Sequence, residues 1–302
     1  MPEPIEFAKL SGSGNDFICI DGRDGRYTDL LSSAQRCAHF ARVLCRRGLG
    51  VGADGVIFAL HPEIDGAADL AARFFEADGS EAELCGNGTG CFVRWAFANR
   101  WADGQEIKIL TTAGVVRGKG LEDDYVRVCI PLPENLQRDQ EIRVAGAPCR
   151  YDFVVTGVPH VITYVQDVDK ADVARLGPLL RHHERFKPRG ANANFVQVIG
   201  EGEIAVRTWE FGVEGETLAC GTGSAAAAIL TAMRQGWPRQ YSSGEKPIRV
   251  RARSGDVLRV YFTVRDDGAI DDVCLETLVR FVYHGRLHPE MAALATGKAN
   301  KD

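Results

Sequence analysis

Apolar residues along the chain fall into short runs separated by turn-forming residues, a pattern that predicts β-strands. In the first half the runs cover residues 17–20, 56–60, 72–76, 107–110 and 126–130. In the second half they cover residues 153–155, 160–165, 195–199, 204–209, 248–252 and 258–264. A last run at residues 278–283 is expected to return to the first half of the fold.

Apolar residues at helical spacing predict few helices, at residues 33–47, 88–99, 171–182 and 223–235. The second and fourth of these are rich in alanine and other small residues. Small side chains allow the close approach of a helix to neighbouring strands. We therefore expect each of these two helices to lie inside a curled sheet.

An internal repeat organises the chain. Residues 81–88 read Glu-x-x-x-Cys-Gly-x-Gly, and residues 216–223 repeat that pattern. A glycine-centred turn between strands follows each copy, at Gly114 and at Gly255. Repetition on this scale is typical of tandem structural units. We predict one domain from residues 1–131 with 275–302 around Cys85, and another from residues 132–274 around Cys220.

Composition narrows the classes of partner. The chain has 302 residues, of which 45% are hydrophobic, and a formal net charge of −5. This acidic balance argues against nucleic acid or an anionic membrane as the main partner. The apolar runs are shorter than the roughly 20 residues that span a bilayer, and the acidic start lacks the features of a secretory signal. A cytoplasmic location is expected.

The nine cysteines are scattered and odd in number, which indicates reduced thiols. Most fit the core: Cys37 and Cys45 have helical spacing, and Cys91 lies within a predicted helix. Four more lie in or beside predicted strands and are interpreted as packing residues, namely Cys19, Cys129, Cys149 and Cys274. The two repeated cysteines, Cys85 and Cys220, need another explanation.

Each repeated cysteine directly precedes a predicted helix, where unpaired backbone N–H groups and the helix dipole stabilise anions. Such a position lowers a thiol pKa from about 8.5 toward roughly 3.5–7.5, so we expect thiolate near neutral pH. The neighbouring glycines let a substrate carboxylate approach the N–H groups.

Two duplicated thiol sites favour inversion of a stereocentre. One group removes the Cα proton and another returns a proton from the opposite face. Helix N-termini stabilise the charge that spreads into the carboxylate at the transition state. The two thiols share one proton, so their pKa values belong to the pair. We therefore predict racemisation or epimerisation by Cys85 and Cys220.

Other interpretations of the repeated motif were weighed. Two buried structural cysteines at glycine turns are one alternative. A zinc site lacks suitable ligand spacing, and a Walker-type phosphate loop lacks its Gly-Lys-Ser/Thr sequence. A papain-like Cys/His nucleophile could recruit His160 but would leave the second copy unexplained.

Over essentially its whole length the sequence resembles the diaminopimelate epimerase family. The matching stretches are residues 12–17 (Gly-Ser-Gly-Asn-Asp-Phe), 50–55 (Gly-Val-Gly-Ala-Asp-Gly), 77–81 (Ala-Asp-Gly-Ser-Glu), 85–88 (Cys-Gly-Asn-Gly), 159–160 (Pro-His) and 214–223 (Glu-Gly-Glu-Thr-Leu-Ala-Cys-Gly-Thr-Gly). The related proline racemases carry histidine where this chain has Asn87.

The resemblance implies an α/β fold of the α+β type, with two pseudo-symmetric domains. Each domain would be a curled, mostly antiparallel sheet around a central helix, and the two would close on the substrate. The family converts LL- to meso-diaminopimelate in lysine and peptidoglycan precursor synthesis. A homodimer without pyridoxal phosphate or metal is implied.

The resemblance also assigns site residues. Cys85 and Cys220 match the acid/base pair. Other positions match groups that hold the reacting carboxylate or contact the substrate: Asn15, Gly86, Asn87, Asn192, Gly221 and Thr222. His160 and Glu210 match polar residues near the two thiols, although a turn and a solvated strand end would explain them structurally.

The sequence departs from the family pattern at four positions, three of which concern the substrate. The family usually has Asn, Asn, Arg and Arg where this chain has Glu76, Val158, Phe211 and Gly90. The first three family residues grip the distal end of diaminopimelate, and phenylalanine cannot replace an arginine that binds a carboxylate. A cation from Arg185, Arg189 or Arg207 would restore that contact.

Two alternative functions stay open, the first of which follows from Glu76, Val158 and Phe211. One is a racemase of another amino acid with a polar or cationic tail, such as histidine, ornithine, lysine or a ureido amino acid. The other is a non-enzymatic binding protein on the same fold, which the presence of both cysteines disfavours.

Overall fold

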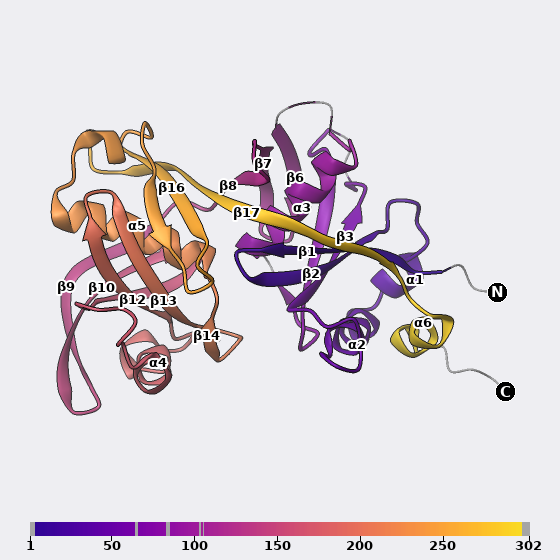
Figure 1. Ribbon diagram of the computed structural model, residues 1–302, viewed down its shortest axis with the longest axis horizontal. Helices are drawn as coiled ribbons and strands as arrows, with labels where there is room; N and C mark the ends of the chain where they lie inside the picture. Colours follow the sequence, from indigo (N-terminus) through magenta and orange to yellow (C-terminus); the bar gives the residue numbers. More distant parts are fainter. Residues whose placement is uncertain (1–3, 64–65, 83–84, 103, 105, 298–302) are drawn as a thin grey trace. The chain divides into compact units, whose positions relative to one another are not determined.

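The computed structural model describes residues 4–63, 66–82, 85–102, 104 and 106–297. The chain divides into two compact units (Figure 1). The first contains Met1–Val128 and Val279–Asp302, and the second contains Cys129–Leu278. The described helices include none that is both long enough and apolar enough to cross a bilayer.

The first unit is built on strands β1 (Glu6–Gly12), β2 (Asn15–Asp21), β3 (Gly55–Leu60), β4 (Leu70–Glu76), β5 (Glu81–Ala82), β6 (Glu106–Thr111), β7 (Gly114–Gly120) and β8 (Tyr125–Cys129). Its helices are α1 (Thr28–Leu31), α2 (Ala34–Cys45), α3 (Gly86–Ala98) and α6 (Pro289–Thr296). Strand β2 runs parallel to β3, and β4 runs parallel to β6. The pairs β1–β2, β3–β4, β6–β7 and β7–β8 are antiparallel.

The second unit contains β9 (Glu134–Val144), β10 (Ala147–Thr156), β11 (Val158–Tyr164), β12 (Asn192–Gly200), β13 (Glu203–Glu210), β14 (Gly215–Thr217), β15 (Ile248–Arg251), β16 (Val257–Val264) and the first part of β17 (Ile270–Arg286). Its helices are α4 (Val173–Arg181) and α5 (Gly221–Gln235), with short 3₁₀ turns at Glu184–Phe186 and Arg239–Tyr241. The parallel pairs are β11–β12 and β13–β15. The pairs β10–β11, β12–β13 and β15–β16 are antiparallel.

The two units repeat one topology. In each unit a helix lies in the connection between two parallel strands. This helix is α2, between β2 and β3, in the first unit and α4, between β11 and β12, in the second. Later in each unit a short strand leads into the central helix, β5 into α3 and β14 into α5. The predicted fold class, with two mostly antiparallel sheets each around one helix, is confirmed.

The central helices are buried in the way their small residues predicted. Four consecutive alanines of α5, residues 225–228, are fully buried within the core of the second unit. In the first unit Cys91, Phe92 and Val93 of α3 are fully buried. At Gly118 of β7 an added Cβ would lie 2.2 Å from Val93 Cγ2, so this close approach of strand and helix requires glycine.

Strand β17 is shared between the two units. Its first part pairs with β16, as in the register Leu275 to Val260. Its last part pairs with β1, as in the register Val279 to Gly12. Figure 1 shows β17 as one continuous strand. The expectation that the last strand returns to the first half of the fold is confirmed.

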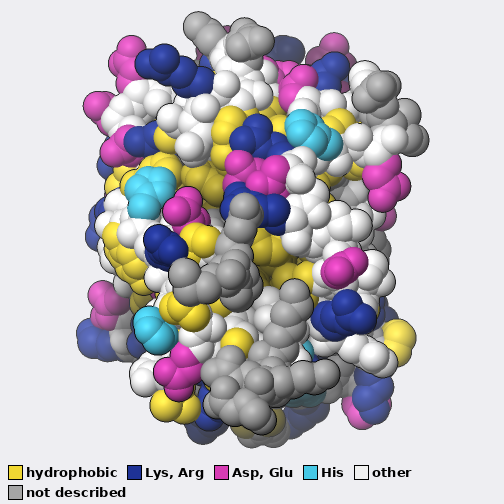
Figure 2. Space-filling model, turned by 90° about the vertical axis from the view of Figure 1, so that its right-hand side faces the viewer, with side chains coloured by type: hydrophobic (Ala, Val, Ile, Leu, Met, Phe, Trp, Pro, Cys, Tyr) yellow, Lys and Arg dark blue, Asp and Glu magenta, His cyan; other side chains and the backbone are white. Residues whose placement is uncertain are grey.

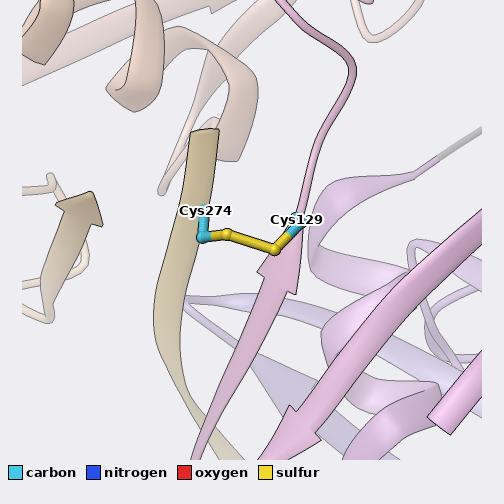
Figure 3. The surroundings of a disulfide bond; sticks show 2 residues. All are labelled: Cys129 and Cys274. Carbon is cyan, nitrogen blue, oxygen red and sulfur yellow. A yellow bond between two sulfur atoms is a disulfide. The ribbon is translucent and has the colours of Figure 1, made fainter. Parts of the chain in front are cut away.

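A disulfide joins Cys129 to Cys274 in the second unit, with the two Cα atoms 4.0 Å apart (Figure 3). The expectation that all nine cysteines are reduced is therefore wrong for these two. Next to them, the backbone N–H of Ile130 donates to the carbonyl of Val273 at 3.0 Å, so pairing at the end of β8 brings the cysteines together. The other seven cysteines are free thiols.

Charges of both signs cover the molecular surface shown in Figure 2. Basic and acidic side chains are interspersed there, with exposed apolar side chains between them. On that face the net charge of −5 is not gathered into a single acidic patch.

Candidate functional site

Cys85 is the N-cap residue of α3. Its backbone is extended (φ −121°, ψ 110°), and its Sγ accepts the backbone N–H of Gly88 at 3.4 Å. An N-cap side chain satisfies one of the N–H groups that have no partner within the helix. Cys85 is half-buried, and Gly86 is the first helical residue. Two residues of the repeated motif, Glu83 and Leu84, lie outside the described part of the chain.

Cys220 occupies the equivalent position before α5, with nearly the same backbone conformation (φ −119°, ψ 112°). Gly221 begins the helix, and the Thr222 hydroxyl lies 3.6 Å from Cys220 Sγ. A Cβ added at Gly223 would lie 2.4 Å from Asn194 Oδ1, so the motif needs glycine there. The prediction that both cysteines directly precede helices is confirmed.

The protonation of Cys220 differs from the expectation. Burial raises the pKa of this thiol well above its ordinary value, and the negative charge of Glu210 raises it further. The N–H of Gly223 and the Thr222 hydroxyl act in the opposite direction, but they do not outweigh burial. The expected lowering of the thiol pKa is therefore wrong for Cys220, which is only 4% exposed. Cys220 holds its proton at neutral pH.

Asn15 and Asn87 meet at the N-terminus of α3. Asn87 Nδ2 donates to Asn15 Oδ1 at 2.7 Å, and Asn15 Nδ2 donates to Asp54 Oδ2 at 3.2 Å. Asp54 directly precedes β3, and its Oδ2 also accepts the backbone N–H of Asp16 at 3.0 Å. A series of hydrogen bonds therefore runs from Asp54, just before β3, through Asn15 at the start of β2 to Asn87, two residues after Cys85.

Two basic side chains neutralise the carboxylates of Asp16 and Asp54. The buried Lys9 ammonium lies 2.8 Å from Asp16 Oδ2, and Arg47 reaches both Asp16 and Asp54, at 2.6 and 2.9 Å. Burial opposes ionisation of Asp16, but hydrogen bonds and charge from Arg47 and Lys9 hold its pKa below the ordinary value. Asp16 therefore stays ionised.

His160 and Asn194 lie beneath the N-terminus of α5. His160 Nε2 is 3.1 Å from Thr222 Oγ1, and His160 Nδ1 is 3.2 Å from Asn194 Nδ2. Complete burial lowers the pKa of His160 to about 3, so the imidazole is neutral at pH 7. Thr156 Oγ1 donates to the Thr222 carbonyl at 3.0 Å.

The remaining expected site residues lie at strand ends. Asn192 begins β12, and its Oδ1 accepts the backbone N–H of Phe211 at 2.6 Å. Glu210 ends β13 and acts on Cys220 electrostatically. Both His160 and Glu210 therefore lie on the Cys220 side within the second unit. Glu76 ends β4 in the first unit.

Sequence reasoning missed Arg181. Its guanidinium carbon lies 4.3 Å from the ring centroid of Phe211, and its Nη2 lies 3.0 Å from Glu214 Oε1. Arg207 was one of the arginines expected to bind the distal carboxylate. Its guanidinium is instead bound by Glu216 at 2.6 Å and by carbonyl groups of the segment before α4. Arg181 ends α4, and only the packing of α4 on β13 and β14 places it beside Phe211.

Metal binding was also considered. Across residues 4–63, 66–82, 85–102, 104 and 106–297, no cluster of three or more His, Cys, Asp or Glu side chains is placed to hold a metal ion. The groups described around the two cysteines are amides, the Thr222 hydroxyl, the Glu210 carboxylate, the neutral His160 imidazole and backbone N–H groups.

Solved structures share this fold. A probable proline racemase from Agrobacterium radiobacter K84 superposes with a TM-score of 0.70 at 15% identity, covering 97% of this chain and 95% of the other. A hydroxyproline epimerase from Agrobacterium vitis gives a TM-score of 0.70 at 14% identity, covering 95% of this chain and 93% of the other.

Sequence comparison is more specific. The family model "Diaminopimelate epimerase" matches residues 7–128 and 153–270. The diaminopimelate epimerase of Aquifex aeolicus is 40% identical over 292 residues, covering 95% of this chain and 99% of that protein. The diaminopimelate epimerase of a Hydrogenobaculum species is 37% identical over 286 residues, covering 94% of this chain and 98% of that protein. This chain is an isomerase and belongs to the diaminopimelate epimerase family.

Proposed function

We propose that this chain epimerises diaminopimelate at one Cα, using Cys85 and Cys220 as a two-base pair. The observation that carries the proposal is the duplication: each unit presents a cysteine as the N-cap of its central helix. The proposal is further supported by full-length similarity to diaminopimelate epimerases. The two repeated units, each with its own cysteine, act as the two domains of the enzyme.

In the proposed reaction Cα loses one proton and gains one proton. One cysteine acts as thiolate and removes the Cα proton, leaving a carbanion whose charge spreads into the carboxylate. The other cysteine, a thiol, then protonates the opposite face of Cα. Burial favours the protonated form of Cys220, so we assign it the role of acid, and Cys85 that of base, for the epimer whose Cα hydrogen faces Cys85. After one turnover the two have exchanged protonation states. No cofactor is needed.

The helix N-termini hold the reacting carboxylate in this proposal. Backbone N–H groups at Gly86 and Asn87 of α3, and at Gly221 and Thr222 of α5, are the family positions for this contact. Unpaired N–H groups at a helix start favour an anion, and they stabilise the charge that develops at the transition state. Asn15, Asn192 and Glu210 are assigned to substrate contacts.

The second carboxylate of diaminopimelate needs a cation, and Arg181 is the group we assign to that role. It stands beside Phe211, the position where arginine was missing from the sequence pattern. Arg181 Nε and Nη2 already pair with Glu214 and its Nη1 donates to the Arg189 carbonyl at 2.8 Å, so of its five N–H donors one on each terminal nitrogen is left for the second carboxylate. Arg181→Met should therefore reduce kcat/KM for diaminopimelate by about tenfold or more, through loss of a charged hydrogen bond.

Glu76, Val158 and Phe211 favour a second candidate, a racemase of an amino acid with a polar or cationic tail. The two candidates predict opposite preferences. The test compares kcat/KM for LL-diaminopimelate with values for lysine, ornithine, histidine and a ureido amino acid, following Cα deuterium from D2O. Preference for diaminopimelate supports our proposal. Preference for a basic amino acid contradicts it, and Phe211→Arg with Glu76→Asn should then gain diaminopimelate activity.

The proposal includes a cytoplasmic homodimer. Support for association comes from the last part of β17, where Val282 and Tyr283 are 54% and 44% exposed. The seven free thiols fit a reducing compartment, whereas the Cys129–Cys274 disulfide runs against it, because disulfides are rare in the cytoplasm. Analytical ultracentrifugation tests the dimer: Val282→Lys should shift the protein to monomer, and a wild-type protein that stays monomeric would contradict the dimer.

A further inference from the structure

A chain of buried polar groups leads from β12 to Cys220, entirely within the second unit. Asn194 Nδ2 lies 3.2 Å from His160 Nδ1, and His160 Nε2 lies 3.1 Å from Thr222 Oγ1. Thr222 Oγ1 in turn lies 3.6 Å from Cys220 Sγ. Asn194 and His160 are fully buried. The donor and acceptor roles along this chain can be worked out from its fixed end.

The amide of Asn194 has one possible orientation. Its nitrogen lies 3.0 Å from the carbonyl oxygen of Val161 and 3.3 Å from that of Asn192. Carbonyl oxygens only accept hydrogen bonds, so the amide nitrogen must face them. Its Oδ1 accepts the Thr208 hydroxyl at 2.9 Å on the other side. Turning the amide over would place oxygen against two oxygens.

This orientation fixes the tautomer of His160. The amide nitrogen of Asn194 is a donor without a usable lone pair, so His160 Nδ1 must be the unprotonated nitrogen. The neutral imidazole therefore carries its proton on Nε2. That N–H donates to Thr222 Oγ1. The hydroxyl of Thr222 then keeps its own hydrogen for another acceptor, and Cys220 Sγ is within reach.

We propose that Asn194 and His160 are positioning residues that aim the Thr222 hydroxyl at Cys220, so that the thiolate of Cys220 is stabilised whenever it has given up its proton. The hydrogen-bond geometry is independent of the proposed function, and only the use of the Cys220 thiolate as a base rests on it. Two other groups face the sulfur: the Gly223 N–H acts in the same sense, and Glu210 on β13 opposes both.

The hydroxyl contribution is tested on the substrate-free enzyme by the pH dependence of Cys220 alkylation with iodoacetamide, read by peptide mass spectrometry. Restricted access of iodoacetamide to the sulfur lowers the alkylation rate by the same factor at every pH, so differences in access between variants do not move the midpoint. Thr222→Val removes the hydroxyl at nearly constant shape and should raise the midpoint by about one unit, whereas Thr222→Ser should leave it near the wild-type value. Cys149, a half-buried free thiol on β10, is the internal control in the same samples and should not shift. Equal midpoints in all three proteins would overturn the proposal.

The role of Asn194 needs a readout that simple structural damage would not mimic. Asn194→Asp replaces the donor by an acceptor, which should move the imidazole proton to Nδ1 and turn the Thr222 hydroxyl toward Nε2. The Cys220 midpoint should rise in the wild-type background but much less in the Thr222→Val background, because orientation acts through Thr222 whereas added charge does not. Equal rises in both backgrounds would contradict the relay.

Ring ¹⁵N chemical shifts of His160 in the wild-type protein test the same inference without any substitution. We expect a protonated Nε2 and an unprotonated Nδ1 across neutral pH. A proton on Nδ1 would overturn the proposal, even if the enzyme proves to be a diaminopimelate epimerase. Conversely, the expected tautomer with no epimerase activity would leave this inference standing and contradict the proposed function.

Discussion

The amide nitrogen of Asn87 donates to Oδ1 of Asn15 at 2.7 Å, which ties helix α3 to the first residue of β2. The second unit has an equivalent tie, in which Thr222 of α5 bonds His160 of β11. In both units the residue two positions after the cysteine is anchored to the strand that begins the parallel pair. The orientation of each thiol-bearing helix end is therefore set by strand pairing.

Asp54→Asn should weaken substrate binding by releasing Asn15. Asp54 accepts from the Asn15 amide, and an asparagine there would also offer a donor that allows Asn15 to turn over. We expect KM to rise about tenfold with a smaller change in kcat, from loss of one hydrogen bond to a charged group.

Asp69 provides the matched control for Asp54. Like Asp54 it precedes a strand and accepts a backbone N–H, in this case from Lys108 at 2.7 Å, and its hydrogen bonds are to Lys108 and not to Asn15 or Asn87. Asp69→Asn should leave KM within about twofold of wild type. An equal rise in KM for both variants would indicate general loss of stability and contradict the positioning role.

The buried His160 should make the free energy of unfolding depend on pH below neutrality. Its folded pKa is about 3, below the ordinary 6.5, so the unfolded chain binds the proton more readily between these values. The free energy of unfolding must therefore fall as pH decreases through that window, by up to about 2 kcal/mol from this group between pH 6.5 and pH 5.

Urea denaturation at pH 7 and pH 5 measures this contribution. His160→Gln should flatten the difference between the two pH values, although the variant is less stable at pH 7. The exposed His61 is the control, and His61→Gln should keep the wild-type difference. An unchanged pH dependence in His160→Gln would contradict a buried neutral imidazole.

The disulfide should be detectable and stabilising. Thiol titration of the unfolded, unreduced chain should give seven thiols, and reduction should expose two more. Replacing both Cys129 and Cys274 by serine should lower the free energy of unfolding by about 2–4 kcal/mol. Cys149→Ser, at a half-buried free thiol, should cost much less. Nine thiols before reduction would contradict the pairing.

Mild oxidation should crosslink the two proposed catalytic thiols. If Cys85 and Cys220 act on opposite faces of one Cα, oxidation of the substrate-free enzyme should join them and abolish activity until a reductant is added. Cys37 and Cys45, two buried free thiols of helix α2, are the comparison pair. Peptide mapping that finds Cys37 joined to Cys45 first would contradict the proposed geometry.

The sequence predicted what depends on local pattern. The central helices and their cysteine N-caps follow from apolar spacing and from the repeated glycine motif. Strand β9 was missed because its residues are mostly exposed or half-buried, so it shows no apolar alternation. Strand β1 was also missed, although its interior is buried on pairing with β2 and β17.

Features that depend on tertiary packing could not be predicted. Cys129 and Cys274 are 145 residues apart, and only the pairing of β17 brings them together. Arg181 reaches Phe211 because α4 packs on β13 and β14, the two strands joined by the turn that carries Phe211. The direction of the Cys220 pKa shift was also predicted wrongly. The sequence indicated a cysteine at a helix N-terminus, but it did not indicate that the thiol is buried.

Single-cysteine variants assayed for inversion in D2O test the two-base mechanism most directly. The assay follows conversion of LL-diaminopimelate, with Cα deuterium in the product read by mass spectrometry, for Cys85→Ala, Cys220→Ala and the control Cys149→Ala. We predict that each of the first two loses inversion by about 10²–10⁴-fold, the usual contribution of a general acid or base, while the control retains it. Full inversion by either Cys85→Ala or Cys220→Ala would contradict the mechanism.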